Sequence, residues 1–518
     1  MSDRARAAPD RHHGGGACAR AACAPGAGRA PDADRVEWGA LLAYGALGLP
    51  LAFAALPIYV HVPRLYAEGL GLSLALVGAV LLAARVVDAI TDPLIGWASD
   101  RLPRRRLWVA LALPALGAGM LGLLIPPAGA GAAWLFGLLV AVSLAYSVAS
   151  IAYNAWGAEV AATPAARTRF VASREAFALV GVVLAAALPG LLGEGVIGGT
   201  AGVGQSAVAT EGGAAGGVGA SGGGGDGGAA GLARLAWLFL PLLVVFGLWT
   251  LWRAPAPPRL AATHAPVWRG LRAALADAAF LRLLAVFAVN GIAAAIPSAT
   301  VLFFVADVLQ AEALAGAFLA LYFLAAAAGL PLWTRLSQRI GKLRAWLAGM
   351  ALAVAVFAWA GLLGSGDLFA YACICALSGL ALGADLTLPP SMLADLLARG
   401  RAGRAPARAP ARACALEAGA CFGWWSFVTK ANLALAAGLA LPLLALLGYA
   451  PGAREPTAVA ALGAVYGFAP VALKLAAIAL LWHGRAVLDP GTGHDPPGIA
   501  TCVAPTSVDR RRTGNDGG

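Results

Sequence analysis

Long apolar segments recur along the whole chain, and short polar or basic stretches separate them. A segment of about 20 apolar residues can cross the hydrocarbon core of a bilayer as a helix. Proline and glycine within such segments are compatible with helices, because neighbouring membrane helices satisfy the freed backbone groups. The predicted spans are 39–62, 73–98, 107–126, 132–157, 174–193, 235–252, 280–304, 313–334, 345–364, 368–393, 422–448 and 458–482. The pattern predicts an all-α membrane protein with twelve transmembrane helices.

Composition and charge support this interpretation. Of the 518 residues, 60% are hydrophobic and only 12% are charged, unlike soluble domains. Of the 37 Lys and Arg residues, only Arg64, Arg234 and Arg454 fall on one side of the predicted membrane, and Arg85, Lys430 and Lys474 fall inside spans. The rest lie on the other side, which the positive-inside rule makes cytoplasmic. We therefore expect both termini in the cytoplasm of a bacterium, with the protein in the inner membrane.

A proline-rich and basic segment, residues 253–279, separates the first six predicted spans from the last six. Similar basic turns follow the second and eighth spans, as expected for two lobes related by a parallel repeat. The predicted units are a disordered cytoplasmic tail (1–36), a six-helix lobe (37–252) with a flexible Gly-rich external loop (194–233), a cytoplasmic linker (253–279), a second six-helix lobe (280–484) and a disordered cytoplasmic tail (485–518).

Two carboxylates, Asp88 and Asp92, interrupt the second span one helical turn apart, so they share a helix face. Each charge near the bilayer centre costs roughly 2.5–3.5 kcal/mol, and such acids usually serve a function. The alternative interpretation is a pair that is neutralised locally by Arg85, or one that is protonated and inert. A bound cation would explain the pair, and carboxylate oxygens suit Na⁺ or Li⁺ as well as a proton. The residues alone leave these three ions open.

Four motifs resemble those of the glycoside, pentoside and hexuronide cation symporters of the major facilitator superfamily, which include melibiose permease. They are the stretch from Arg85 to Arg101 with Asp88, Asp92-Pro93 and Asp100; Tyr153 to Glu159 with Arg167 and Arg174; Gly383 to Asp395 with Asp385 and Pro389-Pro390; and Phe422 to Lys430. The resemblance covers about residues 38–482. It implies a major facilitator fold of two six-helix lobes working by alternating access.

The resemblance also implies roles for individual residues. Asp88 and Asp92 would bind the coupling cation, and would be metal ligands if the ion is Na⁺. Coupling would involve Lys430 and Arg85, solute binding Tyr153, Asn154, Arg174 and Ser426, and gating Asp100, Arg101 and Asp385. A carboxylate such as Asp100 at a helix end can hold the adjacent lobe by charge-assisted hydrogen bonds. Lys474 matches no lysine of the family, and we expect it to be peripheral.

The chain departs from the pattern where melibiose permease holds its sugar. The first span contains no charged residue between 39 and 60, and Ser150 stands where the acid of the fourth helix would align. A small organic solute, such as a sugar or glycoside, is the expected cargo. A proton-coupled exporter or a lipid transporter remains the alternative on the same fold, and a non-transporting receptor or assembly factor the alternative of another class.

An enzyme is not expected, because no nucleophile, base and orienting group converge in the apolar spans. The expected partners are the lipid bilayer, the solute and the coupling cation, without nucleic acid. No cofactor is expected beyond the transported ion, Na⁺, Li⁺ or H⁺, and we expect the protein to function as a monomer.

Overall fold

The computed structural model describes residues 36–58, 62–102, 104–127, 129–191, 227–258, 266–402 and 416–488, and these are almost entirely helical. Most of the predicted amino tail (1–36), of the Gly-rich loop (194–233) and of the carboxyl tail (485–518) lies outside the described residues. Helix α9 begins within the predicted loop, at Gly227, and a short helix, α17, covers Arg485–Leu488.

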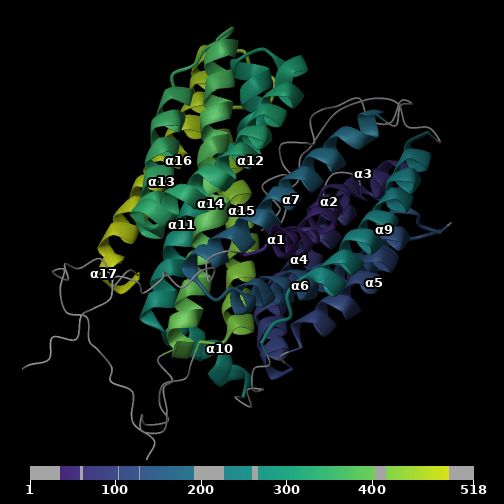
Figure 1. Ribbon diagram of the computed structural model, residues 1–518. Helices are drawn as coiled ribbons and strands as arrows, with labels where there is room; N and C mark the ends of the chain where they lie inside the picture. Colours follow the sequence, from purple (N-terminus) through teal and green to yellow (C-terminus); the bar gives the residue numbers. More distant parts are fainter. Residues whose placement is uncertain are drawn as a thin grey trace, which may run out of the picture.

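Two bundles of helices form the molecule (Figure 1). The first, which we call the N-lobe, contains α1 (Trp38–Gly45), α2 (Gly48–Leu56), α3 (Val62–Arg64), α4 (Leu74–Arg101), α5 (Arg105–Leu124), α6 (Ala132–Val160), α7 (Pro164–Leu191) and α9 (Gly227–Arg253). The second, the C-lobe, contains α11 (Ala278–Phe303), α12 (Ala315–Ile340), α13 (Lys342–Ala360), α14 (Leu368–Ala402), α15 (Ala418–Leu446) and α16 (Pro456–His483). Helix α10 (Val267–Ala276) lies in the linker between them.

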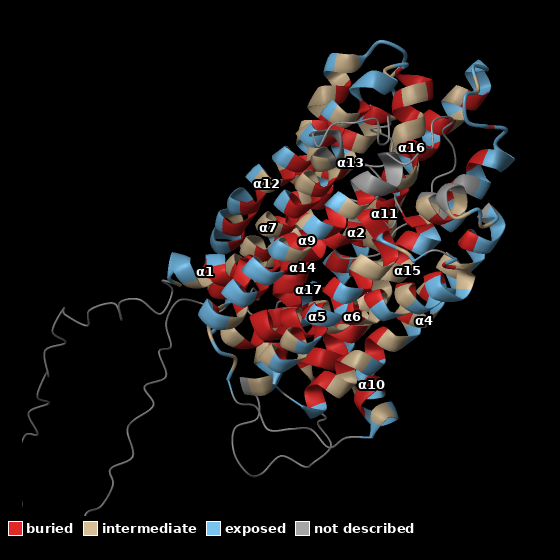
Figure 2. Ribbon diagram, turned by 90° about the vertical axis from the view of Figure 1, so that its right-hand side faces the viewer, coloured by how far each residue is buried: buried red, intermediate tan, exposed pale blue. Residues whose placement is uncertain are grey.

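Each lobe is held by its own apolar core, and buried residues fill the interior of the bundles while exposed ones lie on their surfaces (Figure 2). In the N-lobe, Phe53 stacks on Phe239 with ring centroids 6.1 Å apart. In the C-lobe, Phe287 stacks on Trp425 at 3.7 Å. Burying one such aromatic side chain contributes roughly 1.5–3 kcal/mol, so each bundle has a core that stabilises it separately.

Ten helices in the described part of the chain are long and apolar enough to cross a membrane. Helices α4 and α7, each of 28 residues, are not among those ten. Helix α4 nevertheless has an exposed stripe of apolar side chains at four-residue spacing, formed by Leu82, Val86, Ile90 and Leu94. Such a stripe is what a surface facing lipid requires. The protein is a multi-pass membrane protein.

Two helices extend well beyond their predicted spans. Helix α7 begins at Pro164 rather than near residue 174, and α14 continues to Ala402 rather than ending near 393. Both extensions carry charges that pair with each other, since Arg167 Nη1 lies 3.0 Å from Asp395 Oδ1. Hydropathy ends a span where charges begin, whereas paired charges allow the helix to continue inside the protein.

Helix α10 joins the two lobes at one end of the molecule. We call this the basic end; it carries α10 and the turns 101–105, 160–164 and 340–342. A Cβ on Gly270 would lie 2.9 Å from the indole of Trp97 in the N-lobe. Leu271 O accepts a hydrogen bond from Trp424 Nε1 of the C-lobe at 3.2 Å. The bundles converge toward this end and diverge toward the other (Figure 1).

Candidate functional site

The two acids of α4 point into the protein, opposite its exposed apolar stripe. Asp88 is 6% exposed and Asp92 is fully buried. Their four-residue separation places both carboxylates on the face of α4 that packs against α6 and α15. Helical periodicity puts the pair on one face of α4, and the packing of that face against α15 brings it to the boundary between the lobes.

Lys430 of α15 reaches across this boundary to both acids. Its Nζ lies 2.7 Å from Asp88 Oδ2 and 2.7 Å from Asp92 Oδ2, and donates to Asp92 Oδ1 at 2.8 Å. The same ammonium donates to Ser147 Oγ at 2.8 Å, and Ser147 donates to Asp88 Oδ1 at 3.0 Å. We call Asp88, Asp92, Ser147 and Lys430 the inter-lobe cluster. Its members come from α4, α6 and α15, so it ties the lobes together.

The inter-lobe cluster contains two carboxylates and one ammonium, which leaves one negative charge when all are ionised. An uncompensated charge at this depth is costly, and one monovalent cation would cancel it. Asp92 Oδ2 is buried and, among the described residues, accepts no well-aligned hydrogen bond despite the nearby ammonium. Four oxygens surround Lys430 Nζ: Asp88 Oδ2, the two carboxylate oxygens of Asp92 and Ser147 Oγ.

Ser147 was missed from the sequence, because a serine in a membrane helix is usually a helix-packing residue. Ser426, which was expected to contact the solute, lies one turn before Lys430 on α15. Arg85 lies on α4 just before Asp88 and is half-buried. Within the described residues, no group of three or more His, Cys, Asp or Glu side chains is placed to hold a metal ion.

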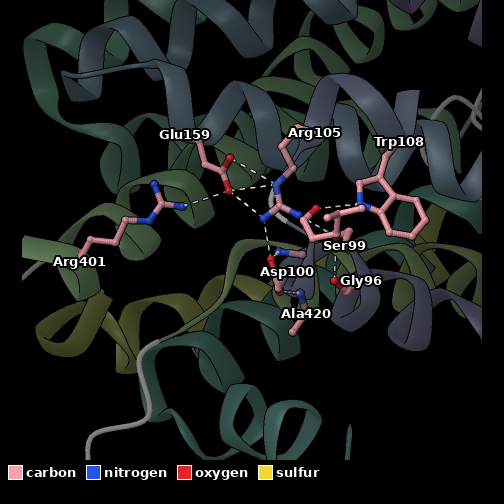
Figure 3. Close-up of polar contacts among 10 residues, drawn as sticks. Gly96, Ser99, Asp100, Arg105, Trp108, Glu159, Arg401 and Ala420 are labelled. Atoms are coloured by element: carbon pink, nitrogen blue, oxygen red, sulfur yellow. Dashed lines mark hydrogen bonds and ion pairs between the residues drawn. The ribbon is translucent and has the colours of Figure 1, made fainter. Parts of the chain in front are cut away.

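A second charged cluster closes the basic end (Figure 3). Asp100 accepts hydrogen bonds from the backbone N–H groups of Gly419 and Ala420 at 2.8 and 2.7 Å, so it caps the start of α15. It also lies 2.6 Å from Arg105 Nη2, and Arg105 contacts Glu159 Oε1 at 2.8 Å. Arg401 of the C-lobe lies 3.7 Å from Glu159. These contacts join α4, α5 and α6 to two C-lobe helices.

Arg101 was expected to take part in gating with Asp100, and the buried contacts described for this cluster are made by Arg105. The guanidinium of Arg101 is exposed and stacks over the Trp97 ring at 4.1 Å, whereas Arg105 is only 1% exposed and makes the buried contacts. Helix α4 ends at Arg101, and Arg105, the first residue of α5, is buried. The run of basic residues indicated the turn, but the sequence did not distinguish the buried arginine.

Glycines bring α4 and α15 into direct backbone contact between these two clusters. A Cβ on Gly96 would lie 2.2 Å from Gly419 O, and a Cβ on Gly423 would lie 2.7 Å from Asp92 O. Only glycine allows this approach, as in other close helix crossings. The short separation lets Lys430 reach the acids and Asp100 reach the α15 terminus.

The expected solute residues of the N-lobe are packed differently from the prediction. Tyr153 is 1% exposed, and its hydroxyl donates a hydrogen bond to the backbone O of Tyr44. The backbone O of Tyr153 in turn accepts a hydrogen bond from the Tyr44 hydroxyl at 2.9 Å. Arg174 is buried inside α7, rather than at its start, and its Nε donates to Glu175 Oε1 at 2.7 Å. Asn154 is half-buried on α6. In this conformation the Tyr153 hydroxyl is a core hydrogen-bond donor.

The prediction that Lys474 is peripheral is wrong. It is 2% exposed, and its Nζ lies 2.9 Å from Asp385 Oδ2 and 2.8 Å from Asn290 Oδ1. Asp385 therefore takes part in a buried ion pair within the C-lobe, one helical turn before the Pro389-Pro390 step that suggested gating. A lysine at membrane depth was the available signal, since such residues are rarely incidental.

Comparisons with solved structures agree with this arrangement. The chain is similar to a bacterial homologue of the iron transporter ferroportin in an outward-facing state (TM-score 0.58, 15% identity, covering 87% of this chain and 100% of that one). It is also similar to the Escherichia coli fucose:proton symporter (0.57, 12%, 86% and 98%) and to a human organic anion transporter (0.58, 15%, 87% and 100%). At these identities the likeness shows the major facilitator fold alone.

A search of curated proteins returned no match. The family profile described as MFS/sugar transport protein matches residues 41–484. Because this match spans both lobes, the chain belongs to the MFS/sugar transport protein family of the major facilitator superfamily, and is a membrane transporter rather than an enzyme.

Proposed function

We propose that this transporter is a cation-coupled symporter of a small organic solute, in which the inter-lobe cluster binds the coupling ion. The observation that carries the proposal is the position of Lys430, whose ammonium bridges Asp88 and Asp92 across the lobe boundary. Two intramembrane carboxylates and one lysine form a site that a single monovalent cation makes neutral. The ion is Na⁺, Li⁺ or H⁺.

Coupling follows from competition at the carboxylates. Without the ion, Lys430 holds α15 to α4; a cation on Asp88 and Asp92 removes part of the attraction for the ammonium. The two lobes are then freer to move relative to each other. A ligand shifts a conformational equilibrium only as far as it binds one state better than the other, and loss of this lobe contact supplies that difference.

The conformation described here is closed at the basic end. The positive-inside rule places that end in the cytoplasm, and we propose that this state faces outward. The Asp100–Gly419, Glu159–Arg401 and Arg167–Asp395 contacts would then form the cytoplasmic gate that must open before the solute is released.

The family description favours a sugar or a related polar solute. The fucose:proton symporter is one transporter of similar fold, and it supports the same class of cargo without identifying it. A proton-coupled exporter or a lipid transporter uses the same scaffold, and the direction of flux in vesicles distinguishes it from a symporter.

Solute uptake into proteoliposomes, driven by an imposed Na⁺, Li⁺ or pH gradient, tests the proposal. Asp88→Asn and Asp92→Asn should insert normally but lose gradient-driven uptake at least a hundredfold, because an amide carries no negative charge with which to bind the coupling cation. Asp367→Asn, in an exposed turn before α14, is the matched control and should transport like the wild type. Full gradient-driven uptake by both α4 variants would refute the coupling role of the cluster.

A further inference from the structure

A second buried ion pair lies entirely within the C-lobe. Lys474 of α16 contacts Asp385 of α14 at 2.9 Å and Asn290 of α11 at 2.8 Å. Trp346 of α13 donates from Nε1 to Asp385 Oδ1 at 2.9 Å. Four helices thus converge on one carboxylate and one ammonium. A buried ion pair is weak evidence for stability, because desolvation cancels much of the attraction, so its presence calls for another explanation.

Asp385 and Lys474 open onto a cavity of about 70 Å³. Its remaining wall is aromatic and hydroxyl-bearing, and includes Phe318, Tyr322, Phe357 and Tyr466. Ligand sites typically combine such an apolar lining with a few convergent polar groups. The cavity therefore has the composition of a binding site.

One wall of the cavity lies beside the boundary between the lobes, and its lining residues all belong to the C-lobe. Leu319 and Phe323 of α12 form part of its wall, and both also pack in one apolar cluster with Ala178 of α7 in the N-lobe. A solute held between the lobes could place one edge in this cavity. The volume is too small for a whole sugar, so the rest of the solute would lie outside it.

The charges of the pair select the kind of solute. The charges of Asp385 and Lys474 cancel. An added cation would therefore be repelled by the ammonium, and an added anion would be repelled by the carboxylate. A hydroxyl group suits both, because it donates to a carboxylate and accepts from an ammonium. Two neighbouring hydroxyls on one ring could contact both members of the pair at once.

We propose that Asp385 and Lys474 form the C-lobe half of the solute site and select a neutral, polyhydroxylated solute such as a sugar or polyol. Asp385 supplies a carboxylate and Lys474 an ammonium to the cavity wall. This inference rests on the proposed transport function and names the substrate class.

Binding to the purified full-length protein, measured by isothermal titration calorimetry, tests the inference. The probes are neutral monosaccharides, disaccharides and polyols, each sugar paired with its uronic acid and its amino sugar. At least one neutral probe should bind, and its charged counterparts should bind at least tenfold more weakly. If none of the neutral probes binds, or a charged counterpart binds more tightly, the inference is wrong.

A pair of variants separates binding from folding. The single change Asp385→Asn leaves a buried ammonium without its counter-charge, so the double variant Asp385→Asn with Lys474→Gln is the informative one. It should remain folded, lose at least tenfold in affinity for the neutral probe, and discriminate less against charged probes. Asp367→Asn should bind as the wild type does. Wild-type affinity and selectivity in the folded double variant would overturn the assignment.

The same measurements distinguish this inference from the proposed function. Asp88→Asn should abolish the effect of Na⁺, Li⁺ or pH on solute affinity, and the double variant should keep that effect at its lower affinity. A double variant with unchanged binding, together with loss of the cation effect in Asp88→Asn, would remove the C-lobe site and leave cation coupling in place.

Discussion

The carboxylate of Asp100, at the end of α4, accepts a hydrogen bond from the backbone N–H of Gly419 at the start of α15 in the other lobe, at 2.8 Å. A negative charge at a helix N-terminus is stabilising, because the first N–H groups have no partner within the helix. One side chain therefore caps a helix and connects the two lobes.

Asp100→Asn should weaken closure at the basic end. The amide keeps the size of the side chain but loses its charge toward both α15 and Arg105, at a cost of about 1.5–3 kcal/mol for charge-assisted hydrogen bonds. We expect spin-label distances between the two lobes at this end to shift toward longer values. Arg339→Gln, at an exposed position near the end of α12, is the control and should leave the distance distribution unchanged; equal effects of the two variants would contradict the assignment.

Gly96→Ala should force α4 and α15 apart, because the added Cβ would lie 2.2 Å from Gly419 O. Overpacking of this kind costs roughly 1–3 kcal/mol, and both helix backbones are involved. We expect a lower unfolding temperature and a more open basic end. Gly78→Ala on the same helix meets nothing within 4 Å and should stabilise by about 0.5–1 kcal/mol through helix propensity. An unchanged unfolding temperature in Gly96→Ala would show that the crossing is not tight.

Lys430→Ala should make the protein depend on cations for its stability. Removing one member of a buried ion pair costs about 3–5 kcal/mol, because the carboxylates of Asp88 and Asp92 lose their counter-charge. Added Na⁺, Li⁺ or acid should therefore raise the unfolding temperature of this variant more than that of the wild type. Thermal unfolding across an ion and pH series measures the difference, with Lys430→Arg as the variant that retains the positive charge. Parallel responses in wild type and Lys430→Ala would exclude a shared site for the ammonium and the ion.

Tyr153→Phe should affect stability without affecting solute affinity. The hydroxyl donates to Tyr44 O in the N-lobe core, and loss of one such hydrogen bond costs about 1 kcal/mol. Tyr44→Phe removes the reciprocal bond and should cost a similar amount. The free energies of unfolding of the two single variants and the double variant would reveal their coupling. A tenfold loss of solute affinity in Tyr153→Phe would instead restore its predicted role as a solute contact.

Several features could be read from the chain because they depend on short stretches of sequence. Apolar length identifies a membrane helix, the distribution of Lys and Arg indicates its orientation, and a four-residue spacing puts Asp88 and Asp92 on one face. The linker predicted at 253–279 likewise contains α10. The boundaries of α7 and α14 were less predictable, because their charged ends are stabilised by partners on the other helix.

Pairings between distant residues depended on how the helices pack. Lys430 and Asp92 are 338 residues apart in the chain, and glycine contacts between α4 and α15 bring them together. Lys474 and Asp385 are close only because α16 packs beside α11 and α14 lies within reach, so hydropathy could not distinguish this lysine from a peripheral one. Arg105 is buried and Arg101 is exposed, although both lie in one run of basic residues, because Arg101 ends α4 whereas Arg105 begins α5 and pairs with Asp100 and Glu159. Local patterns are properties of one helix, whereas each of these pairs depends on the relative rotation and separation of at least two.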